Sequence, residues 1–476
     1  MILGDRAWHI PGYLDSVDGR LRMDGIDLVA LAGARGSPLY VYSAKRMVET
    51  ARRMRQIFES LHPRATICYA SKALSAIKAL RLIHAEGLSI EVNSAGELYR
   101  AKLAGFAPAQ IISNGVSKSV EELHAALSLP IKAINVDSLF ELSRIIQVAR
   151  DLKVRANIAL RVVPNVDSST SPGNQTGSEG TKFGIRQSEV SQALDLIRRA
   201  GDAVVVVGLH GHIGSQIIDT APFALAAGRL ADLFLDIQNG LGHPLEHINV
   251  GGGFPLMYMR GARRSPQGDI FCPEIDYEDI AKAVLPILVE KLGPNVEVIV
   301  EPGRRLVGDS AVMLSTVENT KDRSDGRWLY LDAGYNLLVE SYTYKWYYHA
   351  LTANKLDEPV TGFRVAGPLC DNGDAFFDVD GEQTVERLAK AAPAFAEQRE
   401  LLESLLIRLP KTRPLAQSAA PGDLIAFLDV GAYTLDQFTP NNGRLRPEVG
   451  IIGLNGAYDI IRRRDTQTDL LFNEVL

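Results

Sequence analysis

Cysteine is scarce in this chain, with three thiols among 476 residues: Cys68, Cys272 and Cys370. Cysteines so few and so widely spaced provide no disulfide framework, and none lies in the Cys-x-x-Cys spacing that holds structural metals. We therefore expect reduced thiols and no metal site. A thiol in such a protein does chemistry only where its surroundings activate it.

Long apolar runs and an excess of basic charge are also lacking. No stretch approaches the uninterrupted run of about 18 apolar residues that marks a membrane helix, and the first residues do not follow the pattern of a secretory signal. Lys and Arg number 51 against 57 Asp and Glu, a formal net charge of -6. The short basic runs at 263–264 and 462–464 fit solvated surface. We expect a cytoplasmic protein that binds neither membrane nor nucleic acid.

Strand-like and helix-like segments alternate regularly between about Leu39 and Glu301. Apolar, β-rich runs precede helical patterns at 65–69 and 73–86, at 131–136 and 139–151, and at 203–209 and 222–239. This alternation indicates parallel βαβ units, and a span of about 260 residues is near the size of a (β/α)8 barrel. No Gly-x-Gly-x-x-Gly fingerprint follows the first strand, so the barrel is favoured over a doubly wound open sheet.

The pattern changes after Arg304. Strand-like runs at 328–331, 363–366, 423–428 and 449–454 are separated mostly by Gly, Pro and Asp turns, which indicates a mainly β domain. A helix-favouring segment at 383–409 interrupts this domain and has no evident chemical role. The expected fold class is therefore α/β, with a barrel over 39–305 and a mainly β domain over 306–476.

Lys72 ends the β-branched and apolar run Thr-Ile-Cys-Tyr-Ala-Ser-Lys, which begins at Thr66. A lysine at a strand end is most often a solvated residue that protects the strand from aggregation. It can also form a Schiff base with a carbonyl compound when neighbouring groups support that chemistry. The segments that follow in the chain favour the second interpretation.

Glycine occupies three consecutive positions, Gly251, Gly252 and Gly253, directly after the strand-like run at 248–250. Backbone amides there are shielded by no Cβ, so an anion can approach them closely. A triple glycine is often only a tight turn. At the carboxyl end of a barrel strand, however, such turns bind phosphate, and we expect a phosphate here.

Glu301 ends another nearly continuous apolar strand, at 296–300. A carboxylate in such a place is costly unless it is paired. A buried salt bridge with Arg304 or Lys182 is the simplest structural interpretation. A family resemblance gives a second one.

Short segments spread along the chain carry this resemblance: Tyr69 to Lys72, His210 to Ser215, Asn249 to Pro255, Glu301 to Arg304, Gly367 to Asp374 and Gly431 to Tyr433. Together they resemble the pyridoxal-phosphate (PLP) decarboxylases of the alanine racemase fold, or fold type III, the group that holds diaminopimelate, ornithine and arginine decarboxylases. In motif style they are most similar to diaminopimelate decarboxylases. The resemblance covers nearly the whole chain and implies that residues 1–38 pack with the β domain.

The resemblance implies PLP as the cofactor, bound to Lys72 as a Schiff base. Glu301 would pair with the protonated pyridine nitrogen and so keep the ring a strong electron sink. His212 would stack on the ring, although a core histidine bonded to a backbone carbonyl is an alternative. His210 lies on the same strand face and could instead hydrogen-bond behind the site. The phosphate contacts implied beside the three glycines are Ser215, Gly303, Arg304 and Tyr433.

Cys370 is implied to be the acid that returns a proton after decarboxylation. In the family this cysteine comes from the partner subunit of a head-to-tail homodimer, so that the active sites lie at the subunit interface. Thiols suit the task because their pKa lies near the working range. A lone cysteine is more often buried and inert, but the setting of Cys370 within Gly367 to Asp374 favours the catalytic role.

The family pattern fails at two substrate positions. Diaminopimelate decarboxylases usually carry an arginine that grips a substrate carboxylate and a glutamate after the cysteine that binds the distal amino group. Glu340 and Asp371 stand at these positions, whereas Arg304, Tyr344 and Tyr433 match the remaining substrate contacts. Glutamate in place of arginine inverts the local charge and favours a cationic or neutral substrate group there.

The leading hypothesis is a homodimeric PLP-dependent decarboxylase of an amino acid, with diaminopimelate to lysine as the default reaction. One alternative is a decarboxylase of another basic amino acid, of the D- or L-ornithine or lysine type, or of an amino-acid conjugate in siderophore or antibiotic biosynthesis. A non-catalytic regulator that binds a decarboxylase partner is an alternative of a different class. The joint presence of Lys72, Glu301 and Cys370 disfavours it.

Overall fold

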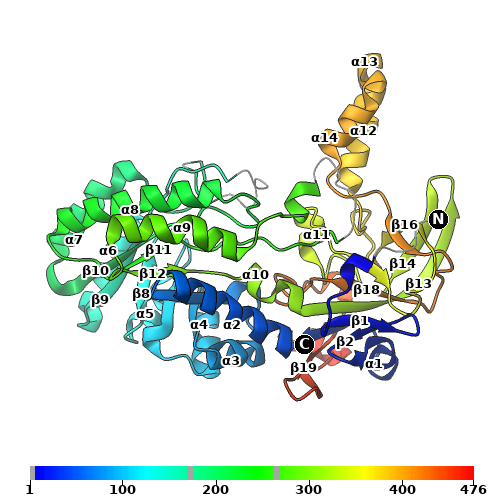
Figure 1. Cartoon of the computed structure of the whole chain (residues 1–476), viewed down its shortest axis with the longest axis horizontal. Coiled ribbons are helices and arrows are strands. Elements are labelled where there is room, and N and C mark those ends of the chain that lie inside the picture. Colours follow the sequence, from blue (N-terminus) through cyan, green and yellow to red (C-terminus); the bar gives the residue numbers. More distant parts are fainter. Residues whose placement is uncertain (1–5, 169–175, 179, 261–267, 476) are drawn as a thin grey trace. The chain divides into compact units, whose positions relative to one another are not determined.

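The computed structural model describes residues 6–168, 176–178, 180–260 and 268–475. The chain divides into two compact units, which Figure 1 shows in sequence colours. We call them the barrel unit, Met47–Leu256 with Pro273–Leu306, and the β unit, Met1–Arg46 with Met257–Cys272 and Val307–Leu476.

Eight parallel strands close the barrel in the spatial order β10-β11-β12-β5-β6-β7-β8-β9. They are β5 Ala65–Ala70, β6 Ser89–Val92, β7 Ile111–Ser113, β8 Ala133–Val136, β9 Ala156–Arg161, β10 Val204–His210, β11 His247–Asn249 and β12 Glu297–Val300. Nearly all of their side chains are buried, as expected for parallel strands covered on both faces. The predicted (β/α)8 barrel is confirmed.

Helices alternate with these strands and cover the outside of the barrel (Figure 1). They are α2 Ala44–Leu61, α3 Ile77–Ala85, α4 Ala95–Ala104, α5 Val120–Leu127, α6 Leu139–Leu152, α7 Val190–Ala200, α8 Ala221–Leu241 and α9 Tyr277–Leu292. The short helix α10, Arg304–Val307, follows the carboxyl end of β12. Several of the barrel helices begin at a residue whose side chain caps the first turn. The Ser94 hydroxyl accepts a hydrogen bond from the Glu97 amide of α4, and the Ser138 hydroxyl accepts one from the Glu141 amide of α6. No helix in the described part of the chain is long and apolar enough to cross a membrane.

The β unit contains two sheets. A three-stranded sheet of β1 Leu14–Val17, β2 Arg20–Met23 and β3 Ile26–Asp27 precedes α1 Leu28–Arg35. A nine-stranded sheet follows the order β17-β16-β14-β13-β4-β19-β20, with β18 paired to β13 and β15. Its members are β4 Leu39–Ser43, β13 Ala311–Arg323, β14 Gly326–Leu331, β15 Ala350–Thr352, β16 Val360–Ala366, β17 Arg413–Ala416, β18 Leu424–Leu428, β19 Glu448–Ile452 and β20 Tyr458–Arg462.

Two strands of the larger sheet differ from what the sequence indicated. Residues 39–43, which the sequence pattern assigns to the barrel, form β4 and pair with β13 and β19. The fully buried run Leu-Tyr-Val-Tyr-Ser has the same composition as a barrel strand, so its pattern does not reveal which sheet it joins. The long strand β13 was not predicted at all, because its second half, from Glu318, is polar and exposed.

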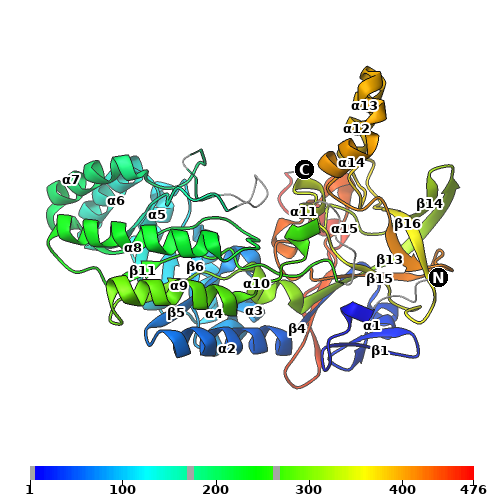
Figure 2. The same ribbon diagram turned by 45° about the horizontal axis from the view of Figure 1, so that its top comes forward.

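Residues 379–406 form three helices that project from the β unit (Figure 2). They are α12 Val379–Ala391, α13 Pro393–Glu397 and α14 Arg399–Leu406, and two small helices, α11 Val339–Thr343 and α15 Gln467–Leu470, complete the unit. Asp378 caps α12 by accepting a hydrogen bond from the Gly381 amide. Only the base of this projection, at Gly381 and Val385, is buried among the described residues.

A buried ion pair braces the barrel between α5 and α6. Lys118 is 4% exposed, and its ammonium donates to Glu141 Oε1 at 2.7 Å and to the Asn135 carbonyl at 2.8 Å. Glu141 Oε1 also accepts from the Asp137 amide at 3.1 Å. Both charges are satisfied, but each depends on the other.

Replacing Glu141 with alanine should therefore destabilise the protein strongly, because Lys118 would remain buried without its counter-charge. We expect the free energy of unfolding to fall by about 3–5 kcal/mol, measured by urea denaturation. The matched control Glu278→Ala removes an exposed pair with Lys282 and should cost at most about 1 kcal/mol. Equal, small losses for the two variants would show that the Lys118 charge does not need Glu141.

Candidate functional site

Four neighbouring barrel strands, β10, β11, β12 and β5, converge on one site at their carboxyl ends. His210 is the last residue of β10, and Lys72, Gly251 and Glu301 follow β5, β11 and β12 within two residues. Because parallel strands end at the same edge of a barrel, residues far apart in sequence meet there. This edge is where barrels of this type carry their chemistry.

The Glu301 carboxylate accepts hydrogen bonds from three side chains. It is buried, and its oxygens accept hydrogen bonds from Asn249 Nδ2 at 2.8 Å, from His210 Nε2 at 3.1 Å and from Asn114 Nδ2 at 3.4 Å. Two side-chain amides and one imidazole therefore donate to Glu301. The salt bridge with Lys182, which was one interpretation of the sequence, is not found among the described residues. His210 thus hydrogen-bonds Glu301, which is the supporting role that the sequence allowed as one possibility for this residue.

These contacts also determine which form each group takes. Burial alone would raise the pKa of Glu301, but His210, Lys72 and Asn249 outweigh it and hold that pKa below its ordinary value. Burial lowers the pKa of His210, so its imidazole is neutral at pH 7 and its Nε2–H donates to the carboxylate. The site thus presents a permanent negative charge beside a neutral histidine.

The glycine turn after β11 packs directly against Glu301. A Cβ on Gly252 would lie 2.1 Å from the Glu301 carbonyl oxygen, and one on Gly253 would lie 2.5 Å from the Gly214 carbonyl oxygen. The Gly251 amide donates to Asn249 Oδ1 at 2.9 Å, and the Glu301 amide donates to the Gly251 carbonyl at 2.8 Å. Only glycine fits this turn, which presents bare backbone at the mouth of the barrel.

His212 lies against this turn. The Gly252 amide donates to His212 Nδ1 at 3.2 Å, which fixes the ring as the Nε2–H tautomer. Burial, followed by the charges of Lys72 and Arg161, lowers the pKa of His212 well below its ordinary value. The ring is therefore a neutral, oriented aromatic surface.

Ser215 and Arg304 contact each other through their side chains. Arg304 is buried, and its Nε lies 3.3 Å from Ser215 Oγ. Gly303, the preceding residue, accepts a hydrogen bond from the Leu306 amide at 3.1 Å as the short helix α10 begins. A hydroxyl, a guanidinium and unshielded amides at one place form a suitable environment for an anion.

Lys72 stands in a single 3₁₀ turn, Ser71–Ala73, that directly follows β5. The Ser71 hydroxyl donates to Glu97 Oε2 at 2.7 Å, and the Leu74 amide closes the turn by donating to the Ser71 carbonyl at 3.1 Å. The two neighbours of Lys72 are buried, whereas Lys72 itself is exposed. The turn thus holds the backbone of this lysine between two buried neighbours.

The remaining predicted site residues belong to the β unit, where Cys370 lies in a loop held by hydrogen bonds. Cys370 is exposed, and its amide donates to Asn442 Oδ1 at 2.7 Å. Asp371 accepts from the Tyr335 hydroxyl at 2.8 Å, and that hydroxyl accepts from Asn441 at 2.7 Å. The loop is therefore fixed at both residues while the thiol stays free of the core.

Helix α11 packs against this loop and carries Glu340. The Tyr342 ring stacks on Tyr335 with centroids 4.8 Å apart. Glu340 is 2% exposed, and Tyr344, the C-cap residue directly after α11, is exposed. The structure thus brings together the segments of Glu340, Tyr344, Cys370 and Asp371 within the β unit.

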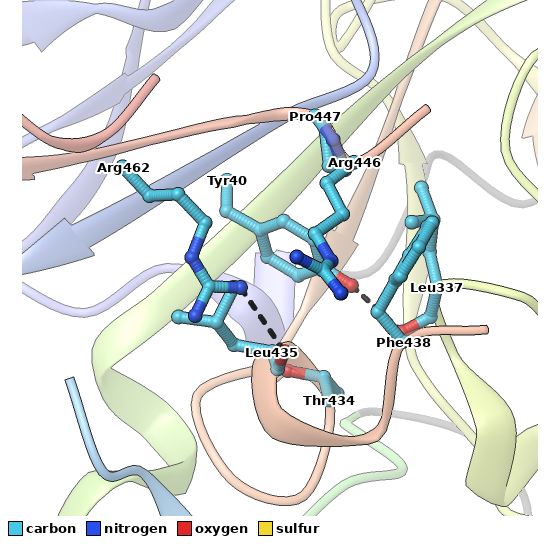
Figure 3. A pocket seen from close by; sticks show the side chains of 8 residues that line it. All are labelled: Tyr40, Leu337, Thr434, Leu435, Phe438, Arg446, Pro447 and Arg462. Carbon is cyan, nitrogen blue, oxygen red and sulfur yellow. Dashed lines mark hydrogen bonds between the residues drawn. The ribbon is translucent and has the colours of Figure 1, made fainter. Parts of the chain in front are cut away.

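Tyr433 lies in a strained turn at the end of the loop after β18. Its φ of 57° is in the left-handed region, and a Cβ on the nearby Gly431 would lie 1.9 Å from the Val307 carbonyl oxygen. The segment after Tyr433 is anchored around a small pocket (Figure 3), lined by Tyr40, Leu337, Thr434, Leu435, Phe438, Arg446, Pro447 and Arg462. There the Tyr40 hydroxyl donates to the Leu337 carbonyl at 2.8 Å.

Several residues of this arrangement were not found from the sequence. Asn114 and Asn249 bond Glu301, and Asn442 holds the Cys370 loop. Asn249 is the last residue of the apolar strand β11, and Asn114 directly follows the apolar strand β7. These positions at strand ends were the only feature of the sequence that could have indicated a role in the site. The buried Glu91 on β6 was missed as well. An isolated polar residue in an apolar strand belongs to no recognisable motif.

Comparison with known proteins agrees with this geometry. The model of the pyridoxal-dependent decarboxylase pyridoxal-binding domain matches residues 45–308. Diaminopimelate decarboxylase from Archaeoglobus fulgidus is 32% identical over 95% of this chain and 96% of its own length, and that from Bacillus subtilis is 31% identical over 95% and 94%. The crystal structure of diaminopimelate decarboxylase from Methanocaldococcus jannaschii in complex with L-lysine superimposes with a TM-score of 0.81 at 29% identity, covering 98% of each chain.

The domain match spans more than half of the chain, and the relatives align along nearly all of it. The glycine turn, the buried carboxylate and the strand-end lysine lie within the matched domain. This chain therefore belongs to the family of pyridoxal-dependent decarboxylases that contains the diaminopimelate decarboxylases.

Proposed function

We propose that this chain is a PLP-dependent decarboxylase that converts meso-diaminopimelate to lysine. The single observation that carries the cofactor chemistry is the ionised Glu301 carboxylate, held in the barrel by neutral donors. The assignment of the substrate rests on the similar diaminopimelate decarboxylases, which align with this chain over nearly their whole length. The similar diaminopimelate decarboxylase from Methanocaldococcus jannaschii was crystallised with L-lysine, the product expected here.

The residues present fit PLP. A buried carboxylate without a cationic protein partner in its hydrogen-bond set suits a pyridinium, and the glycine turn offers backbone that a Cβ would block. We assign Lys72 to the covalent bond, Glu301 to the ring nitrogen and His212 to the ring face. We assign the phosphate to Gly251, Gly252, Gly253, Ser215, Gly303, Arg304 and Tyr433.

When bound, PLP supplies an electron sink for the charge that remains on the substrate carbon after CO2 leaves. Glu301 contributes by holding a proton on the ring nitrogen, and a neutral His210 allows it to do so without a competing positive charge. Cys370 Sγ then donates a proton to that carbon. The Cys370 loop is rigid because Asn442 and Tyr335 hold it, so the thiol is presented with little loss of freedom.

We further propose a homodimer in which Cys370 and Asp371 of each subunit serve the partner's barrel site. The support is chemical: the acid sits in the β unit, outside the barrel that carries Lys72, and it is exposed rather than built into its own core. An exposed thiol held by an ordered loop is suited to donating across an interface.

Glu340 favours a second candidate within the same chemistry. Glu340 stands at the position where the family offers an arginine. Its helix, α11, carries Tyr342, which stacks on the Tyr335 that bonds Asp371. A carboxylate there cannot grip the distal carboxylate of diaminopimelate. A basic amino acid of the ornithine or lysine type, with a cationic end, would be accepted instead.

The assignment of Lys72 predicts that the purified protein is yellow and that borohydride traps PLP on this residue. Lys72→Ala should abolish turnover, because no other group can hold the cofactor at this strand end. Peptide mass spectrometry identifies the reduced adduct. The control Lys78→Ala, at an exposed position in α3, should bind PLP normally. Recovery of the adduct on another lysine would refute the assignment.

The shared site predicts complementation between two inactive variants. Lys72→Ala and Cys370→Ala homodimers should each be nearly inactive. After subunits exchange, half of the dimers are mixed and one of the two sites in each is intact, so about a quarter of wild-type activity should return. A CO2-release assay measures this, with exchange verified by mass. No recovery after verified exchange would place both residues in one chain.

Substitutions of Glu340 distinguish the two substrate candidates, diaminopimelate and a basic amino acid of the ornithine or lysine type. If this residue lines the substrate pocket, unmodified protein should use a substrate with a cationic end better than meso-diaminopimelate. Glu340→Arg should then shift kcat/KM toward diaminopimelate by about 1–3 kcal/mol. The control Glu340→Gln removes the charge without adding a donor fork and should shift it less. Efficient use of diaminopimelate, with no change of preference in either variant, would mean that Glu340 does not contact the substrate.

A further inference from the structure

A second carboxylate, Glu91, lies in the barrel and has no part in the chemistry described so far. It belongs to β6, whose register places Glu91 opposite Ala70 of β5, two residues before Lys72. Its exposed fraction is 0%, and neither of its oxygens makes a hydrogen bond in the part of the chain that the structure describes. A buried carboxyl without donors is costly, so its presence calls for a functional reason.

Charged groups surround Glu91 from several elements. Lys72 faces it from the turn after β5, Glu301 from the end of β12 and Glu97 from α4. Glu91 in turn acts on Arg161 of β9 and on Cys68 of β5. Lys72 is thus the cation that acts most strongly on Glu91, and two other carboxylates disfavour its ionisation.

The contrast with Glu301 indicates a different task for Glu91. Glu301 receives three side-chain hydrogen bonds and stays ionised. No hydrogen bond of that geometry reaches Glu91 in the described structure, and the Asn114 amide is the weakest of the groups that act on its charge. Burial raises the pKa of Glu91 to about 7, Lys72 opposes the rise, and Glu301 and Glu97 add to it. Two carboxyls whose surroundings separate their pKa values in this way serve as a fixed charge and as a proton carrier.

We propose that Glu91 relays a proton between the incoming substrate amine and Nζ of Lys72. When the substrate amine displaces Lys72, the bond from Nζ to the cofactor carbon breaks, and its electron pair goes to Nζ. Glu91 gives its proton to Nζ, and the proton lost by the incoming nitrogen restores the Glu91 carboxyl. One C–N bond replaces another, no oxidant or reductant is needed, and Lys72 leaves as a neutral amine.

This inference rests on the covalent bond of Lys72 in the proposed function, and the test is chosen to separate the two. The holoenzyme is mixed with methoxyamine, which displaces the lysine without any decarboxylation, and the loss of the visible absorption band is followed. Methoxyamine is uncharged across the neutral range, so its own titration does not enter the rate.

In the wild type the displacement rate should fall as pH rises through about 7, because Glu91 loses the proton that it must donate. Glu91→Gln should be slower by about 10²-fold, near the lower end of general-acid contributions, and should show no inflection there. Glu91→Asp, which keeps an acid, should recover part of the rate. The control Glu297→Gln alters a carboxylate at the opposite end of the barrel, paired with Lys132, and should match the wild type.

Thermal stability provides an independent readout on the same variant. The pKa of Glu91 is raised by folding, so its cost to stability is absent below the ordinary carboxyl pKa, grows as pH rises from there to about 7, and is fully present above that pH. Glu91→Gln should therefore raise the melting temperature more at pH 8 than at pH 5. A residue with a purely structural role would lose stability on this change.

Equal displacement rates for wild type and Glu91→Gln, or a pH profile that Glu91→Gln leaves unchanged, would overturn the proposal while the Lys72 assignment stands. Absence of a PLP adduct on Lys72 in every variant would instead remove the proposed function itself. A slower but more stable Glu91→Gln protein, with partial rescue by Glu91→Asp, is the result that the proton relay predicts.

Discussion

A carboxylate buried at the carboxyl end of β12 imposes the conditions that the rest of the barrel site meets. An ionised acid away from water is unfavourable by several kcal/mol unless donors surround it. Glu301 obtains these donors from three different strands: His210 ends β10, Asn249 ends β11 and Asn114 follows β7. Only a closed barrel brings these positions together, so the charge depends on the fold as a whole.

The other parts of the site follow from this charge. The glycine turn approaches Glu301 more closely than any side chain would permit, and it orients His212 through the Gly252 amide. Lys72 lowers the pKa of both carboxyls near it, yet only Glu301 has the donors to remain charged at neutral pH. Burial raises the pKa of Glu91 to about 7, and Lys72 and Asn114 only partly offset that rise. One barrel edge thus holds a permanent charge and a mobile proton close to the same lysine.

The sequence predicted the features that depend on spacing within one segment. The (β/α)8 barrel followed from the alternation of elements, and the glycine turn and Lys72 from their positions at strand ends. It did not predict contacts that depend on which strands become neighbours. The β4 strand looked like a barrel strand, and Glu91 and Asn114 were single polar residues in apolar surroundings. Their roles follow only from the three-dimensional arrangement.

The protonation state of the bound cofactor tests this account most directly. PLP labelled with ¹⁵N in the pyridine ring reports by NMR whether the ring nitrogen carries a proton. A Glu301 that stays ionised should keep this nitrogen protonated in the holoenzyme from about pH 6 to 9, and Glu301→Gln should leave it neutral. A neutral ring nitrogen in the unmodified holoenzyme at pH 7 would contradict the central role given to the buried carboxylate.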